Sequence, residues 1–158
     1  GVDLIFCAGY AYRIPVESVP DVKAVNVHPS MLPNGRGPWP LPWVILNDEK
    51  TTGVTIHKLN ERFDEGDIII QRSFPVSEKE NYFSLEAKMT DVSLKLTKEL
   101  FENFDFLYSN GKKQCKGEYL AEPGDNMRTI YDDTPSEQRE KILRAFGEDY
   151  VIYGGKRK

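Results

Sequence analysis

The chain has 158 residues, of which 39% are hydrophobic and 29% charged, with a formal net charge of -4. This length fits one compact domain that buries about two thirds of its unfolded surface. The negative charge argues against a nucleic-acid-binding surface, which is usually basic. No apolar run approaches the length of a membrane span, and the N-terminus lacks a signal-peptide pattern. We therefore expect a cytoplasmic protein with no membrane partner; the composition leaves its oligomeric state open.

The two cysteines also favour a cytoplasmic location. Cys7 lies in an apolar run and Cys115 in a polar one, and their positions do not have the close spacing of metal ligands. We expect reduced thiols and no metal site.

The first elements are read as buried strands. Residues 2–8, VDLIFCA, form a continuous apolar run that is typical of a strand covered on both faces in a parallel sheet. Pro15 and Pro20 lie in a short crossover. Residues 23–28, KAVNVH, are the predicted second strand. Because the first strand begins at the second residue without a preceding methionine, we expect the chain to be part of a longer one.

A loop, a short helix and a hairpin follow. The segment GRGPWPLPWVILNDEK is rich in glycine and proline at its front and predicts a helix over 42–47. Residues 53–58 alternate between apolar and polar side chains and predict a strand. A polar loop separates them from the β-branched run that ends near residue 76, so the two runs predict an antiparallel hairpin.

Residues 81–108 carry a helical apolar stripe, with Asn81 as the expected N-cap and Asn110-Gly111 as a stop. Beyond it we expect a strand near 112–120, a polar loop over 128–133, a helix starting at Pro135 and a final strand over 150–155. The predicted fold class is α/β, a mainly parallel sheet with flanking helices and a β-hairpin. Residues 1–110 form the main unit, and 111–158 a short α+β extension.

A polar triplet marks the candidate site. Asn26 and His28 are two residues apart in a predicted strand, so they project from the same face. Pro29 then ends regular pairing, which places both side chains at a strand end, where open α/β sheets put their chemistry. Asp64 lies in the hairpin loop. Each of the three has an ordinary structural explanation when taken alone, as a turn residue or a half-buried strand residue.

His57, the second of the two histidines, is interpreted as structural because it alternates onto a predicted strand.

Two sequence motifs contain the three residues of the triplet. NVHPSMLPNGRG, followed by TGVTIHKLNERFDEGDIII, resembles the catalytic domain of the 10-formyltetrahydrofolate-dependent formyltransferases. The resemblance extends from about Val2 to Leu107 and implies a Rossmann-like fold. It puts Asn26, His28 and Asp64 on the family's catalytic Asn, His and Asp. The residues that match the loop after the histidine are Ser30, Leu32, Pro33, Arg36 and Gly37.

The resemblance implies a reaction in which a substrate amine attacks the formyl carbon on N10 of the folate. Asn26 and His28 would donate hydrogen bonds to the formyl oxygen as it gains negative charge. Asp64 would hold His28 in its donating state, raise the pKa of His28, and help to move a proton from the amine. Neither a metal nor a covalent enzyme intermediate is needed.

The resemblance also implies where the cosubstrate 10-formyltetrahydrofolate binds. The family holds the pterin largely through backbone groups of two loops. In this sequence the matching residues are Tyr10, Tyr12 and Ile14 after the first strand, and Asn60, Glu61, Arg62 and Phe63 before Asp64.

The amine acceptor stays open. Family members have roughly half a Rossmann fold ahead of the strand that opens this chain, and methionyl-tRNA formyltransferases carry a basic C-terminal domain that grips tRNA. The loop PWPLPWVIL and the mixed charge of the last fifty or so residues favour a small or nucleotide-linked amino sugar. Methionyl-tRNA is a less favoured acceptor. A formyltetrahydrofolate hydrolase would use the same triplet, and a folate-binding remnant without turnover is the non-enzymatic alternative.

Overall fold

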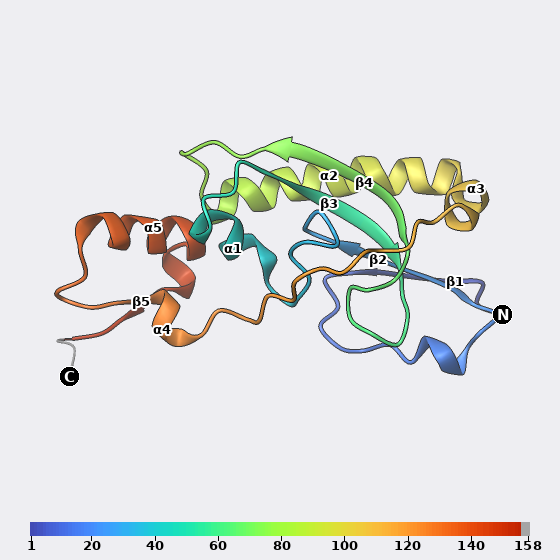
Figure 1. Ribbon diagram of the computed structural model, residues 1–158, viewed down its shortest axis with the longest axis horizontal. Coiled ribbons are helices and arrows are strands. Elements are labelled where there is room, and N and C mark those ends of the chain that lie inside the picture. The colour runs from blue at the N-terminus through green and yellow to red at the C-terminus, as the bar shows by residue number, and fades with distance from the viewer. Residues whose placement is uncertain (156–158) are drawn as a thin grey trace.

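The computed structural model describes residues 1–155. Its main sheet has four strands in the order β1-β2-β3-β4 (Figure 1). These are β1 (Leu4–Ala8), β2 (Lys23–His28), β3 (Thr51–Lys58) and β4 (Ile68–Pro75). A short 3-10 helix, η1 (Val16–Ser18), lies on the path from β1 to β2.

The prediction of a mainly parallel sheet is wrong for these four strands. Only β1 and β2 run parallel, whereas β2–β3 and β3–β4 are antiparallel. The connection after β2 contains only the seven-residue helix α1 (Pro40–Leu46), which packs against the C-terminal helix α5 (Ser136–Phe146). The chain therefore does not cross back over the sheet, and β3 enters it from the opposite end. The predicted hairpin is confirmed as β3 and β4.

A long helix covers one face of the sheet. α2 (Tyr82–Glu102) begins at a capping box in which Asn81 accepts from the Ser84 N–H and Ser84 accepts from the Asn81 N–H. Its buried stripe packs into one core with strand residues, and the members of this core include Leu85, Met89, Leu96, Leu100, Val25, Val54 and Ile56. The predicted single helix is broken at Asn103, after which α3 (Phe104–Ser109) begins.

The chain then runs back along the molecule to a small C-terminal unit (Figure 1). That unit contains α4 (Asp125–Arg128), β5 (Thr129–Ile130), α5, η2 (Glu148–Tyr150) and β6 (Ile152–Tyr153), with β5 parallel to β6. The helix after Pro135 and the final strand are confirmed.

Two expectations for this part of the chain are wrong. Residues 112–120 make only isolated bridges, at Lys112 and Tyr119. The expected polar loop over 128–133 instead contains β5, because Thr129 and Ile130 are buried under α5. The division of the chain at residue 110 stays a prediction. Residues 156–158 of the predicted C-terminal extension lie outside the described part.

None of the helices within residues 1–155 is both long and apolar enough to cross a membrane.

Candidate active site

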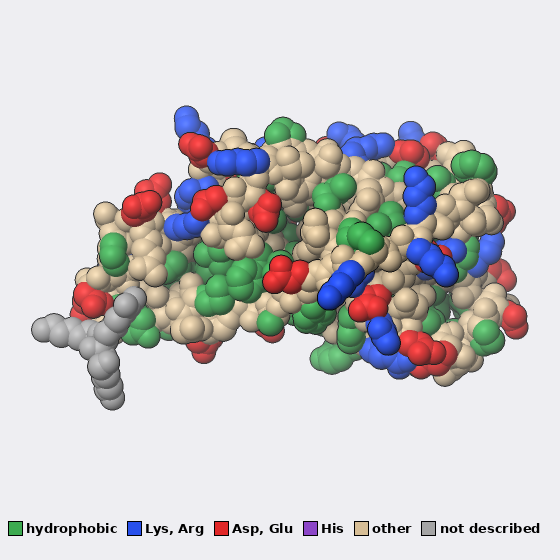
Figure 2. Space-filling view, in the orientation of Figure 1, with side chains coloured by type: hydrophobic (Ala, Val, Ile, Leu, Met, Phe, Trp, Pro, Cys, Tyr) green, Lys and Arg blue, Asp and Glu red, His purple; other side chains and the backbone are tan. Residues whose placement is uncertain are grey.

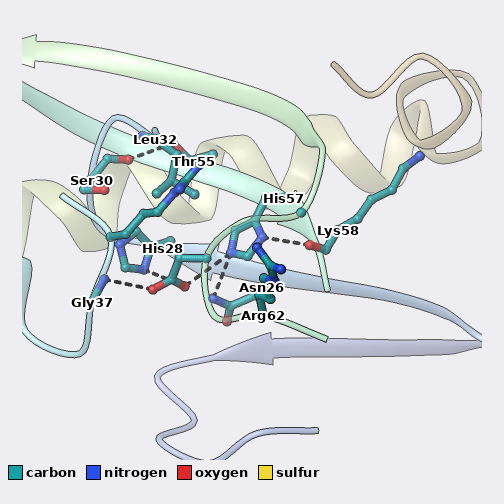
Figure 3. Close-up of polar contacts among 12 residues, drawn as sticks. Asn26, His28, Ser30, Leu32, Gly37, Thr55, His57, Lys58 and Arg62 are labelled. Carbon is teal, nitrogen blue, oxygen red and sulfur yellow. Dashed lines mark hydrogen bonds and ion pairs between the residues drawn. The ribbon is translucent and has the colours of Figure 1, made fainter. Parts of the chain in front are cut away.

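Two neighbouring strands bring the polar side chains together. In the antiparallel pairing of β2 with β3, Asn26 lies opposite His57, and His28 lies opposite Thr55. Because side chains alternate along a strand, these four residues project from one face of the sheet. Asn26 is half-buried, whereas His28 is 5% and His57 1% exposed. The sheet therefore places an amide and two imidazoles next to one another (Figure 3).

Asp64 enters this group from a tight turn between β3 and β4. Its φ of 57° is in the left-handed region, which non-glycine residues rarely adopt. Two residues later, a Cβ on Gly66 would lie 1.8 Å from the Lys58 carbonyl oxygen, so only glycine fits there. The turn directs the Asp64 side chain inward, where it is 9% exposed.

The carboxylate of Asp64 lies between the backbone and both histidines. Its Oδ2 accepts a hydrogen bond of 2.9 Å from the Gly37 N–H. Its Oδ1 lies 3.4 Å from His28 Nδ1 and 3.7 Å from His57 Nε2. Asn26, His28 and Asp64 thus converge in one place, as the sequence predicts.

The hydrogen bonds of His28 define its tautomer. Nε2 lies 2.8 Å from the Gly35 carbonyl oxygen, which can only accept, so Nε2 carries a proton. In neutral His28 the remaining nitrogen, Nδ1, is then an acceptor that faces the Asp64 carboxylate. A proton added at Nδ1 would bridge the two groups. The family resemblance implies that the His28 N–H donates to the formyl oxygen. In this conformation the Nε2–H of His28 instead donates to the Gly35 carbonyl.

His57 belongs to the same cluster, and its interpretation as an ordinary strand histidine is incomplete. Its Nδ1–H donates to the Lys58 carbonyl at 2.8 Å, which leaves Nε2 to accept from the Asn26 amide at 3.3 Å. His57 therefore orients Asn26 and also faces Asp64. The missed signal is the antiparallel register, which alternation within a single strand does not reveal.

Burial and the neighbouring groups act in opposite directions on the pKa values of His28 and Asp64. Burial lowers the pKa of His28 below its ordinary value, and this outweighs the opposite charge of Asp64. Asp64 thus acts to raise the pKa of His28 as expected, but the net shift is downward because burial has the larger effect. For Asp64, burial acts to raise the pKa, but the facing His57, the His28 charge and the Gly37 N–H together hold it below its usual value. Asp64 is thus ionised at neutral pH, between two imidazoles.

The loop that follows His28 is anchored to the sheet by polar side chains. Thr55 Oγ1 donates to the Ser30 carbonyl at 2.7 Å and accepts from the Leu32 N–H at 3.1 Å. Gln71 donates to the Leu32 carbonyl and to Thr55 Oγ1. These hydrogen bonds fix the part of the loop that leads to Gly35, whose carbonyl contacts His28. Across residues 1–155, every buried side-chain nitrogen or oxygen has a hydrogen-bond partner.

The cluster lies at the base of a cleft of ≈ 370 Å³ that is open to solvent. Asn26, His28 and Asp64 line it. So do six of the seven residues predicted to hold folate, namely Tyr10, Tyr12, Ile14, Asn60, Arg62 and Phe63. Glu61 does not line the cleft; its backbone carbonyl accepts from Arg13 Nε at 3.2 Å. Tyr119, from the segment after α3, also lines the cleft and was not predicted.

This geometry can support a reaction in which an oxygen gains negative charge and a proton is released. Within the described residues the Asn26 amide donates one hydrogen bond, to His57, so its second N–H is available to a ligand in the cleft. The Asp64–His28 pair can take up a proton close by. Nowhere in residues 1–155 do three or more His, Cys, Asp or Glu side chains form a group that could hold a metal ion. The fold and the site define an α/β protein equipped to stabilise an oxyanion and accept a proton.

Comparison with known proteins supplies the family. A model of the formyl transferase family matches residues 1–100. The methionyl-tRNA formyltransferase of Ehrlichia ruminantium (strain Welgevonden) is 31% identical over 157 residues, 98% of this chain and 52% of that protein. The chain belongs to the formyl transferase family, and it spans about half the length of this curated relative.

Solved structures agree with this assignment. A 4-N formyltransferase from Francisella tularensis matches with a TM-score of 0.80 and 28% identity, over 99% of this chain and 66% of that one. The formyltransferase PseJ from Anoxybacillus kamchatkensis, in complex with a UDP-linked formamido sugar and tetrahydrofolate, matches with a TM-score of 0.69 and 33% identity. That match covers 77% of this chain and 65% of the other. The Rossmann-like formyltransferase fold predicted from the sequence is confirmed.

Proposed function

We propose that this chain carries the catalytic site of an enzyme that transfers the formyl group of 10-formyltetrahydrofolate to a primary amine. The observation that carries the proposal is the convergence of Asn26, His28 and Asp64 at the base of the cleft. The tetrahydrofolate bound by PseJ, a relative of similar fold, supports a folate donor. We assign folate contacts to the residues predicted for that role, Tyr10, Tyr12, Ile14, Asn60, Glu61, Arg62 and Phe63.

We propose a direct transfer of the formyl group from the folate to the amine. The amine nitrogen forms a bond to the formyl carbon, and the carbonyl oxygen gains negative charge that the free Asn26 N–H stabilises. The amine gives up a proton to the Asp64–His28 pair, where Nδ1 of His28 can hold it against Asp64 Oδ1. The bond from the formyl carbon to N10 then breaks, and N10 keeps the electron pair and receives a proton. One proton leaves the amine and one reaches N10, so the protein ends unchanged.

We propose an amino sugar, free or linked to a nucleotide, as the acceptor. The Francisella 4-N formyltransferase matches nearly the whole chain, including its C-terminal part, and PseJ binds a UDP-linked formamido sugar. The net charge of -4 also gives little attraction to RNA. On the face shown in Figure 2, acidic and basic side chains are interspersed and do not form a basic stripe.

Methionyl-tRNA is the second candidate acceptor, because the curated relative that matches 98% of the chain is a methionyl-tRNA formyltransferase. The test is a panel of acceptors, supplied with 10-formyltetrahydrofolate and the full-length gene product. Formylation of a nucleotide-linked amino sugar supports the proposal, and formylation of methionyl-tRNA alone would replace the acceptor. Formate release at the same rate with no amine present would identify a hydrolase instead.

A further inference from the structure

Gln114 lies in the extended segment between α3 and α4 and was not singled out by its sequence context. Its side chain is half-buried and uses both ends. Oε1 accepts from Arg36 Nε at 3.2 Å and from Arg36 Nη2 at 2.8 Å. Nε2 donates to the carbonyl oxygens of Asp64 at 2.8 Å and Gly66 at 2.7 Å. These four hydrogen bonds use the full capacity of a primary amide.

The two groups that Gln114 joins both determine where the Asp64 carboxylate lies. Asp64 and Gly66 form the turn that carries the side chain, and this turn needs support because Asp64 has a positive φ. Arg36 immediately precedes Gly37, whose N–H donates to Asp64 Oδ2. Gln114 thus connects the turn that carries the Asp64 carboxylate to Arg36, and the next residue, Gly37, donates a hydrogen bond to that carboxylate.

Arg36 makes this link rigid. It is 7% exposed, and its Nη2 also donates to the Cys115 carbonyl at 3.1 Å. Its Nη1 lies 3.6 Å from Glu65 Oε1, and its carbonyl accepts from the Leu120 N–H at 2.7 Å. The buried guanidinium is therefore held from several sides, and Gln114 extends this anchorage to the Asp64 turn.

We propose that Gln114 is a positioning residue that holds the Asp64 carboxylate against His28, an inference that rests on the proposed function. Gln114 does not line the cleft, so it acts through Asp64 and does not touch the substrate. A shift of about 1 Å in a group that supports the chemistry can cost on the order of a hundredfold in rate. Removal of the amide should therefore lower turnover much more than folate binding.

Two variants test this on the full-length gene product. Gln114→Glu keeps an acceptor for Arg36 but turns a carboxylate toward the two turn carbonyls. Gln114→Met removes all four hydrogen bonds at nearly constant length. We expect kcat to fall on the order of a hundredfold in both, with KM for 10-formyltetrahydrofolate within about threefold of wild type. The control is Trp43→Phe, which removes the hydrogen bond from Trp43 to the Ala121 carbonyl in the same segment and lies outside the cleft.

A second readout does not depend on activity. NMR can follow the titration of His28 in the same protein, with its signal assigned by its loss in His28→Gln. The charged or titratable groups that face His28 are Asp64 from the turn and His57 from β3, beside the Gly35 carbonyl. The negative charge of Asp64 acts to raise the pKa of His28. If Asp64 moves away in Gln114→Met, the titration midpoint of His28 should fall, whereas Trp43→Phe should leave it unchanged.

The outcomes separate the two proposals. An unchanged His28 midpoint in Gln114→Met overturns the positioning role, even if the variant is less stable. If that variant does not fold, Gln114→Glu decides, and a kcat within threefold of wild type overturns the proposal. If the wild type formylates no amine, the proposed function fails, while the His28 titration still shows whether Gln114 positions Asp64.

Discussion

The base and the mouth of the cleft are built in different ways. At the base, His57 is 1% and Asp64 9% exposed, and His28, Asp64 and His57 are each held by a backbone partner. At the mouth, Tyr12 is 75% and Phe63 51% exposed. The base has the rigidity that oriented donors and a proton acceptor require, whereas the mouth can adapt to a ligand. The difference predicts that substitutions at the base alter turnover and substitutions at the mouth alter binding.

The largest effect should come from His28→Ala, which removes the partner of Asp64. We expect formyl transfer to fall by on the order of 10²–10³-fold, the scale for loss of a key polar group at a reacting centre. The dissociation constant for 10-formyltetrahydrofolate should stay within roughly tenfold, because the residues proposed to contact folate do not include His28. Turnover with the true amine would be measured beside folate binding. Comparable turnover in the variant and the wild type would contradict the assigned role.

Asp64→Asn should be nearly as damaging. The substitution keeps the size of the side chain but removes the charge that faces His28 Nδ1 at 3.4 Å. Because the two residues act together on one proton, the double variant His28→Ala/Asp64→Asn should be hardly slower than the slower single variant. A double-mutant cycle on kcat measures this coupling. Independent, multiplicative losses would show that the two side chains have separate tasks.

A stability effect should follow from Gly66→Ala at the Asp64 turn. The added methyl group would lie 1.8 Å from the Lys58 carbonyl oxygen, so the backbone must move. We expect the free energy of unfolding to fall by about 1–3 kcal/mol, the range for overpacked sites. Denaturant unfolding checks this, with Gly155→Ala as the control because nothing lies within 4 Å of its added methyl. Equal stability of the two variants would show that the turn is not constrained as described.

The dependence of stability on pH tests the burial of His28. Its pKa is lowered from an ordinary value of 6.5, so just below pH 6.5 the unfolded chain takes up a proton that the folded chain does not. Stability should therefore decrease as the pH falls from 6.5 toward the pKa of the folded state. Thermal unfolding of wild type and His28→Gln over this range should show a smaller slope in the variant. Parallel slopes would mean that His28 is not buried in its neutral form.

The smallest effect on stability is expected at the mouth. Phe63 is half exposed, so Phe63→Ala should change the free energy of unfolding by no more than about 0.5 kcal/mol. It should weaken folate binding by only a few-fold if the backbone of this loop supplies the main contacts. Calorimetric titration with a folate measures the change. A complete loss of binding would mean that the side chain itself holds the ligand.

Local patterns made much of this site predictable. Asn26 and His28 are two residues apart on one strand, so their common face follows from alternation alone. The capped helix over 82–102 and the hairpin of β3 and β4 also follow from local periodicity. Asp64 was found through the motif in which it stands, since its distance from His28 along the chain gives no geometric information.

The features that the sequence did not predict depend on contacts between distant segments. The direction of β3 depends on the path of the chain after β2, and the role of His57 depends on its register with Asn26 across the β2–β3 pairing. Gln114 lies in a segment without periodicity, and its partners are 48 to 78 residues away. Tertiary packing decides such contacts, so single-sequence patterns do not contain them.

We propose that the base of the cleft performs the chemistry and that the mouth binds the donor. The most direct test measures kcat for formyl transfer and the dissociation constant for 10-formyltetrahydrofolate on wild type, His28→Ala and Phe63→Ala. We expect His28→Ala to lose turnover and keep folate binding, and Phe63→Ala to weaken folate binding and keep turnover. If both quantities change in parallel in both variants, the base and the mouth of the cleft do not have separate tasks.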